Sequence, residues 1–125
     1  MNLSDSFEVL YAIKEKDLET EQTQSSSKLL LTSRIFTLME IPATSLMQHL
    51  LKKDEVSVGV IVNINHASRI QKNTQVRIVA TFKEIRDKVY VFDVQIFDKR
   101  VLISSGTHSR TIILKEELTK KRITQ

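Results

Sequence analysis

The chain has 125 residues, of which 41% are hydrophobic and 27% are charged, and its formal net charge is +4. This length predicts one compact domain over residues 1–125, which buries roughly two thirds of the unfolded surface. The chain has no cysteine, which excludes disulfides and thiolate-based zinc or iron–sulfur sites. The first residues lack the pattern of a signal peptide, and no apolar run reaches the ~20 residues that span a membrane. We therefore expect a cytoplasmic protein with no membrane partner.

The charge is unevenly distributed along the chain. Residues 1–21 hold six acidic and two basic residues, so the remainder carries 17 basic and nine acidic residues, a net charge of +8. A basic body attracts anionic ligands such as nucleic acid, phosphates or coenzyme A. The alternative is that these charges serve only solubility.

The first half of the chain predicts a strand, a loop and a helix. Phe7, Val9 and Tyr11 alternate as in a short strand. Residues 20–28, TEQTQSSSK, are polar and predict a flexible loop. Apolar residues at helical spacing then predict the main helix over about 33–51, with Thr32 or Ser33 as its N-cap; the apolar stripe consists of Ile35, Leu38, Met39, Leu46 and Leu50.

Pro42 interrupts the predicted helix. A proline inside a helix removes one hydrogen bond and clashes with the preceding turn, at a cost of about 3 kcal/mol. We therefore expect either a kink or two short helices.

From residue 56 onward the sequence alternates with period two and predicts four antiparallel strands. The first strand places one set of side chains toward the helix, namely Val58, Val60, Val62, Ile64 and His66. Asp98, Lys99 and Arg100 form a hairpin turn between the last two strands. Residues 115–125, KEELTKKRITQ, predict an exposed charged tail or short helix. The order of elements predicts an α+β fold with one main helix on a five-stranded antiparallel sheet, whose other face meets water, a partner or a ligand.

Three histidines and two glycines are candidates for a site. His49 has no obvious partner, whereas His66 ends a strand at the rim of the helix–sheet interface. Glu40 could reach this rim from the same subunit or from a partner. Gly59 and Gly106 both fall inside predicted strands, where a glycine marks either close approach of a ligand or backbone, or a bulge. The sequence has no phosphate-binding glycine loop, no GxSxG or HExxH motif and no metal-ligand spacing, so we expect no metal and no bound cofactor.

Three segments together resemble one known family. TSRIFTLME, SVGVIVNINHAS and SSGTHSRTII are similar to motifs of single-hot-dog thioesterases of the fluoroacetyl-CoA thioesterase type, over about residues 29–113. The resemblance implies a hot-dog fold, an acyl-CoA substrate that itself carries the coenzyme A, and a homodimer with sheets joined edge to edge. It also implies a catalytic triad of Thr32, Glu40 and His66. Gly59 would lie near the acyl group, and the GTHER-like strand of the family falls on Gly106, Thr107, His108, Ser109 and Arg110.

The implied residues suit thioester hydrolysis by several routes. Glu40 could act as a general base on water or on Thr32, or attack the thioester directly. His66 could polarise or protonate the reacting centre, and a free amide at the helix start could bind the carbonyl oxygen. Four basic residues are candidates for the phosphates of coenzyme A, namely Arg69, Lys72, Arg77 and Arg110.

The sequence departs from the family pattern at Pro42, in the run after His66 and in the segment TEQTQSSSKLL, which has no match to the aromatic lid of the type member. We therefore do not predict fluoroacetyl-CoA as the substrate. The predicted function is hydrolysis of a small or medium acyl-CoA. The alternatives are a non-catalytic hot-dog module that binds an acyl ligand and, from charge alone, a nucleic-acid module, although we expect no nucleic-acid partner.

Overall fold

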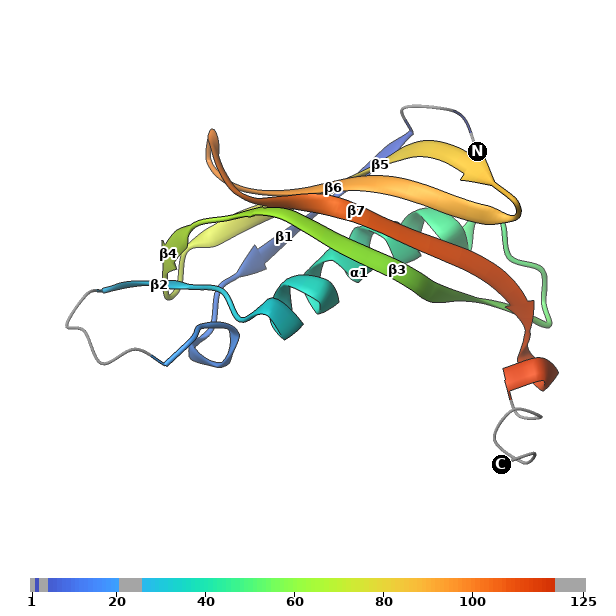
Figure 1. The fold of residues 1–125 in the computed structure, drawn as a ribbon, viewed down its shortest axis with the longest axis horizontal. Coiled ribbons are helices and arrows are strands. Elements are labelled where there is room, and N and C mark those ends of the chain that lie inside the picture. The colour runs from blue at the N-terminus through green and yellow to red at the C-terminus, as the bar shows by residue number, and fades with distance from the viewer. Residues whose placement is uncertain (1, 3–4, 21–25, 119–125) are drawn as a thin grey trace.

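The computed structural model describes residue 2, residues 5–20 and residues 26–118. Five antiparallel strands form a sheet in the order β1-β5-β6-β7-β3, and one long helix, α1, crosses one face of it (Figure 1). The predicted α+β architecture of one main helix on a five-stranded antiparallel sheet is therefore confirmed. The bounds are Ser6–Ala12 for β1, Thr32–Gln48 for α1, Glu55–Ala67 for β3, Gln75–Arg86 for β5, Val89–Asp98 for β6 and Val101–Leu114 for β7.

The helix differs from its prediction at its start and at Pro42. Leu31 occupies the N-cap position and makes no side-chain cap, so the prediction that Thr32 or Ser33 caps the helix is wrong. The helix also continues through Pro42, so the alternative of two short helices is wrong. Pro42 is buried among the apolar residues that pack α1 on the sheet, and this packing offsets the lost hydrogen bond.

Strand β3 contains two bulges. Its pairing with β7 shifts between Gly59 and Ile61 and again between Ile64 and His66, so one extra residue is inserted at each place. The first extra residue is Val60, and the second is Asn65. Each insertion exchanges the faces to which the following side chains point.

The bulges overturn the predicted alternation of β3. Side chains directly opposite one another in an antiparallel pair share a face. Val62 lies opposite the fully buried His108 and so faces α1, whereas His66 lies opposite Ser105, on the other face. The prediction that Val58, Val60, Val62, Ile64 and His66 all face the helix is therefore wrong.

Short elements close the ends of the fold. Strands β2 (Ser27–Leu29) and β4 (Arg69–Gln71) pair with each other, so the flexible loop predicted for 20–28 is wrong at residues 27 and 28, while 21–25 lie outside the described residues. The hairpin turn at 98–100 is confirmed, with Lys99 in the left-handed region at φ 56°. Residues 115–118 of the predicted tail form an exposed helical turn, and 119–125 lie outside the described residues. No helix within the described residues has the length and apolar character needed to cross a bilayer.

A buried ion pair fixes the start of α1. Asp17, at the end of the 3-10 helix Glu15–Asp17, is 0% exposed. Its carboxylate accepts hydrogen bonds from Tyr11 Oη at 2.6 Å, the Lys14 amide at 2.8 Å and Arg34 Nε at 2.7 Å. Its backbone carbonyl also accepts the Leu31 amide, at 2.8 Å. Burial alone would raise the pKa of Asp17, but the hydrogen bonds and the charge of Arg34 outweigh it and hold the pKa below its ordinary value.

Candidate active site

Glu40 lies against the backbone of β3 at Gly59. A Cβ atom placed on Gly59 would be 3.7 Å from Glu40 Oε1, 3.6 Å from Arg110 Nη1 and 3.4 Å from His108 Cε1. The carboxylate and the guanidinium are therefore within about 8 Å of each other, and their charges attract. Four of the predicted site residues, Glu40, Gly59, His108 and Arg110, thus lie together.

Arg110 is a buried cation that is held in one orientation. It is 6% exposed, and its Nε and Nη2 donate to the hydroxyl and carbonyl oxygens of Ser57, both at 3.0 Å. Burial lowers the pKa of Arg110, while the negative charge of Glu40 acts in the opposite direction. The sequence analysis missed Ser57, although it shares a strand and a side-chain parity with Gly59.

His108 completes the cluster as a neutral imidazole. It is 0% exposed, and burial, followed by the positive charge of Arg110, lowers its pKa to about 4. Its Nε2 lies 3.0 Å from Arg110 Nη1. Because a guanidinium only donates, Nε2 is the acceptor and Nδ1 carries the hydrogen. Nδ1 is buried and has no hydrogen-bond partner among the described residues.

Thr32 lies on the same side of α1 as Glu40. The two residues are eight positions apart, so their side chains project about 80° apart around the helix and about 12 Å apart along its axis. Thr32 is the first helical residue and is exposed. The Arg34 amide donates to the Leu31 carbonyl oxygen at 2.9 Å, and no side chain caps this end of the helix, so within the described residues the amides of Thr32 and Ser33 remain available to bind an oxyanion.

His66 lies at the other end of β3. Its Nε2 is 3.2 Å from the Leu102 carbonyl oxygen and 2.9 Å from Ser68 Oγ. Because a carbonyl only accepts, Nε2 carries a hydrogen in this contact. The His66 side chain is exposed.

The three predicted triad residues do not meet within one chain. His66 follows Gly59 by seven residues on β3, which corresponds to about 20 Å of extended strand. Glu40 touches the Gly59 end, so the possibility that Glu40 reaches His66 within the same subunit is excluded. Figure 1 shows α1 and β3 running in opposite directions, so the Thr32 end of the helix lies toward the His66 end of the strand.

Gly106 differs from Gly59 in its surroundings. A Cβ atom on Gly106 would lie 1.9 Å from the Asn63 carbonyl oxygen, so β3 occupies the space in which a side chain would stand. Gly106 therefore allows the close approach of the bulged strand β3. Of the two glycines, only Gly59 borders the cluster of Glu40 and Arg110, and the placement of Gly106 gives no support to its predicted contact with substrate.

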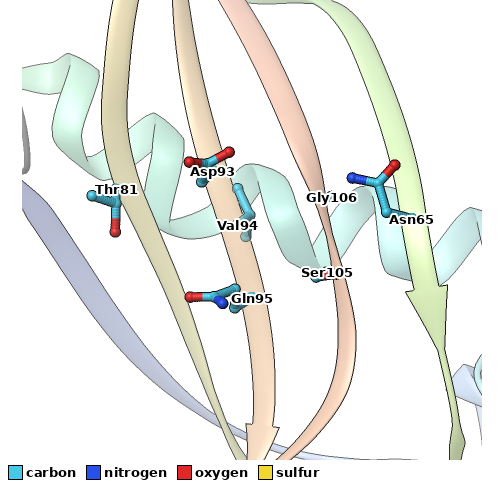
Figure 2. A pocket seen from close by; sticks show the side chains of 7 residues that line it. All are labelled: Asn65, Thr81, Asp93, Val94, Gln95, Ser105 and Gly106. Atoms are coloured by element: carbon cyan, nitrogen blue, oxygen red, sulfur yellow. The ribbon is translucent and has the colours of Figure 1, made fainter.

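A hollow lies on the face of the sheet opposite the Gly59 cluster. Figure 2 shows its polar side chains, Thr81, Asp93, Gln95, Ser105 and Asn65, with α1 behind the strands. Its volume is about 290 Å³. The sheet separates this hollow from Glu40, so it is not part of the cluster. Within the described parts of the chain, no three histidine or acidic side chains gather as metal ligands.

The basic residues predicted to bind phosphates occupy different environments. Arg69 and Lys72 are exposed next to β4, a few residues beyond His66. Arg77 pairs with Glu8 at 2.9 Å, and Lys72 with Glu15 at 3.6 Å. Arg110 is buried behind Gly59, which argues against a surface role in phosphate binding.

Comparison with known proteins identifies relatives of this chain. The model of the FlK family, described as fluoroacetyl-CoA-specific thioesterase, matches residues 13–116. The structure of the fluoroacetyl-CoA thioesterase FlK superposes with a TM-score of 0.85 at 20% identity, covering 100% of this chain and 97% of that one. A variant of FlK in complex with acetyl-CoA gives 0.84 at 19% identity, with 99% and 98% covered. No curated protein sequence matches at a significant level.

Two further solved structures have the same fold. A hot-dog-like protein from Thermanaerovibrio acidaminovorans gives a TM-score of 0.85 at 16% identity, covering 98% of this chain and 90% of that one. A thioesterase superfamily member from Thermus thermophilus gives 0.84 at 16% identity, with 98% and 93% covered. The predicted hot-dog fold is thus confirmed.

Proposed function

This chain belongs to the family of fluoroacetyl-CoA-specific thioesterases, and we propose that this acyl-CoA thioesterase completes its active sites in a symmetric homodimer. One observation carries the proposal: Glu40 lies at Gly59, whereas His66 lies about 20 Å farther along the same strand. A site that uses both residues therefore needs two copies of the chain.

The free edge of β3 supplies a surface for this dimer. β3 is an outer strand of the sheet, and it exposes two apolar residues, Val60 at 48% and Ile61 at 54%. Such an edge is a template for pairing with another strand. Gly59 and His66 are equally far from the midpoint between residues 62 and 63. A two-fold axis there pairs two β3 strands antiparallel and brings the His66 end of the partner's strand level with Gly59 and Glu40.

The proposed reaction is hydrolysis with Glu40 as general base. Glu40 takes a proton from water as the water oxygen attacks the thioester carbonyl carbon. The free amides at the start of α1 hold the negative oxygen of the tetrahedral intermediate. When this intermediate collapses, the carbon–sulfur bond breaks, and the coenzyme A thiolate leaves. A free thiol has a pKa near 8.5, so the thiolate needs little help, and it receives the proton that Glu40 took from water, which the partner subunit's His66 relays.

The same arrangement offers a place for the nucleotide. Arg69 and Lys72 follow His66 closely in the chain and are exposed. In the proposed dimer they lie on the side from which the thioester arrives, where their charges favour the phosphates of coenzyme A. No other cofactor is needed for this hydrolysis, and a cytoplasmic location stays a prediction from the sequence.

Mixing two inactive variants tests the shared site. Glu40→Gln and His66→Asn are purified separately, and thiol release from acetyl-CoA and butyryl-CoA is measured for each. We expect each variant to lose about 10²–10⁴-fold in kcat, as for removal of a general acid or base. After subunit exchange, half of the dimers are mixed, and each mixed dimer has one intact site, so activity returns to about a quarter of wild type.

Other outcomes have defined meanings. If mixing restores nothing although exchange is shown by mass-tagged subunits, the site does not combine Glu40 and His66 from different chains. If both variants keep nearly full activity, the catalytic assignment is wrong. Tight binding of acyl-CoA by the wild type without thiol release would favour the non-catalytic module.

A further inference from the structure

We propose that Phe36 sets the length of the acyl group that the enzyme accepts and restricts it to short chains of about four carbons or fewer. The inference rests on the proposed function, because that function places the thioester carbonyl between the first amides of α1 and Glu40. The roles proposed so far for the triad and for the residues around Gly59 do not involve the aromatic ring of Phe36.

The position of Phe36 on α1 follows from helical spacing. Phe36 is four residues after Thr32 and four residues before Glu40, so the three side chains follow one another along a single stripe. Neighbours at this spacing have Cβ atoms about 5–6 Å apart. A thioester held between the first amides of α1 and the Glu40 carboxylate therefore passes the Phe36 ring.

The exposure of Phe36 is unusual for its direction. At about 100° per residue, Phe36 projects between the directions of Ala43 and Met47, and both of these residues are 0% exposed. Phe36 itself is 37% exposed. The same side of α1 is therefore buried at Ala43 and Met47 but partly exposed at Phe36, nearer the start of the helix. An apolar ring beside a catalytic carboxylate is suited to an apolar part of a substrate.

The opposite wall leaves little room for a long chain. Behind Gly59 lie the guanidinium of Arg110 and the imidazole of His108. Arg110 is held by three hydrogen bonds to Ser57 and His108. A hydrocarbon chain entering there would displace a buried, hydrogen-bonded cation, which is strongly unfavourable. The acyl group is therefore confined to the space between this polar wall and the Phe36 ring.

The test compares Phe36→Ala with a matched control, Ile41→Ala. Ile41 is also 37% exposed on α1, but it projects about 140° away from Phe36. We would measure kcat/KM with acetyl-, butyryl-, hexanoyl- and decanoyl-CoA. We expect the wild type to favour acetyl and butyryl groups, and Phe36→Ala to raise the hexanoyl-to-acetyl ratio by about tenfold or more. Ile41→Ala should leave this ratio within about twofold.

The inference is overturned if Phe36→Ala lowers kcat/KM for all chain lengths equally or leaves the ratio within about twofold of wild type. Phe36→Leu, a smaller change, replaces it if the alanine variant does not fold, and should shift the ratio in the same direction. A parallel series of non-hydrolysable thioether analogues gives the same ratio from Kd. If the wild type binds these analogues selectively but releases no thiol, hydrolysis is contradicted, and the Kd ratios still test whether Phe36 sets the acyl length. A wild type that binds none would overturn both proposals.

Discussion

Two arginine clusters in this protein are built on different plans. Arg34 meets Asp17, a buried carboxylate that also receives Tyr11 and the Lys14 amide, so opposite charges are paired and hydrogen-bonded. Arg110 is itself buried, and its side-chain partners are a neutral imidazole and Ser57. Its countercharge, Glu40, is an exposed carboxylate beyond hydrogen-bond contact on an open surface. The first cluster is complete, whereas the second leaves a carboxylate free for chemistry.

The contrast shows how structural charges differ from functional ones: the hydrogen-bonding groups around a structural charge all have partners, whereas those around a functional charge do not. A network whose members are all satisfied holds a fold in one arrangement. In the second cluster, His108 Nδ1 has no hydrogen-bond partner among the described residues and Glu40 is exposed, so the fold does not use the hydrogen-bonding capacity of these two groups. Each of the following variants tests one side of this difference.

The largest effect is expected from Asp17→Ala. This change leaves Arg34 without its buried partner and removes the acceptor for Tyr11 and the Lys14 amide. Breaking a buried pair on one side costs about 3–5 kcal/mol, and we expect this loss in the free energy of unfolding measured with urea. A loss below about 1 kcal/mol would show that the cluster is not structural.

A smaller effect is expected on acidification, through His108. Its pKa in the folded state is lowered to about 4, against about 6.5 unfolded, so the unfolded chain binds more protons between these values. The stabilisation is complete above pH 6.5 and is lost as the pH falls toward 4. We expect a free energy of unfolding about 2 kcal/mol lower at pH 5 than at pH 7.

His108→Gln provides the control for this pH dependence, since glutamine keeps an acceptor for Arg110 but does not titrate. The difference between pH 5 and pH 7 should largely disappear in this variant. Asp17 contributes in a separate window, because its lowered pKa places its loss below its ordinary range, near pH 4 and under. An unchanged pH profile in His108→Gln would contradict the buried neutral imidazole.

The smallest effect is expected from Tyr11→Phe. The variant removes one hydrogen bond to Asp17 but leaves the Lys14 amide and Arg34 in place. A single hydrogen bond to a charged group contributes about 1.5–3 kcal/mol, and the partial exposure of Tyr11 places the loss at the lower end, about 1.5 kcal/mol. Activity should stay within about twofold of wild type, since the cluster of Glu40 and Arg110 at Gly59 is unchanged. A large loss of kcat with unchanged stability would mean that Tyr11 acts on the site itself.

The sequence predicts the elements well because their apolar patterns are long. The helix is recognisable from Ile35 to Leu46, and the alternation around Ile78 and Val94 identifies central strands. β2 and β4 are missed because three residues carry too little periodicity to be distinguished from a turn.

Sequence patterns predict only part of the candidate site. The family-like motifs predict Glu40, Gly59, His108 and Arg110, which the fold brings together. They do not reveal that the side chains of β3 change faces twice, because a bulge leaves no signature in the alternation of residues such as Val60 and Asn65. The Asp17–Arg34 pair is likewise hidden, since its partners are joined only through the tertiary fold.

The bulge at Val60 divides β3 into two segments in which opposite parities of residue number face α1. The one extra residue lets Ser57 and Gly59 before it and Val62 after it face α1 together, although their numbers differ in parity. Deleting Val60 would make the pairing regular and leave these faces unchanged, whereas deleting Val58, which lies in the regular pairing, would turn Ser57 away from α1. In the regular parts of this strand, chain length therefore carries as much information as residue identity, and a deletion there acts like a frameshift within a folded protein.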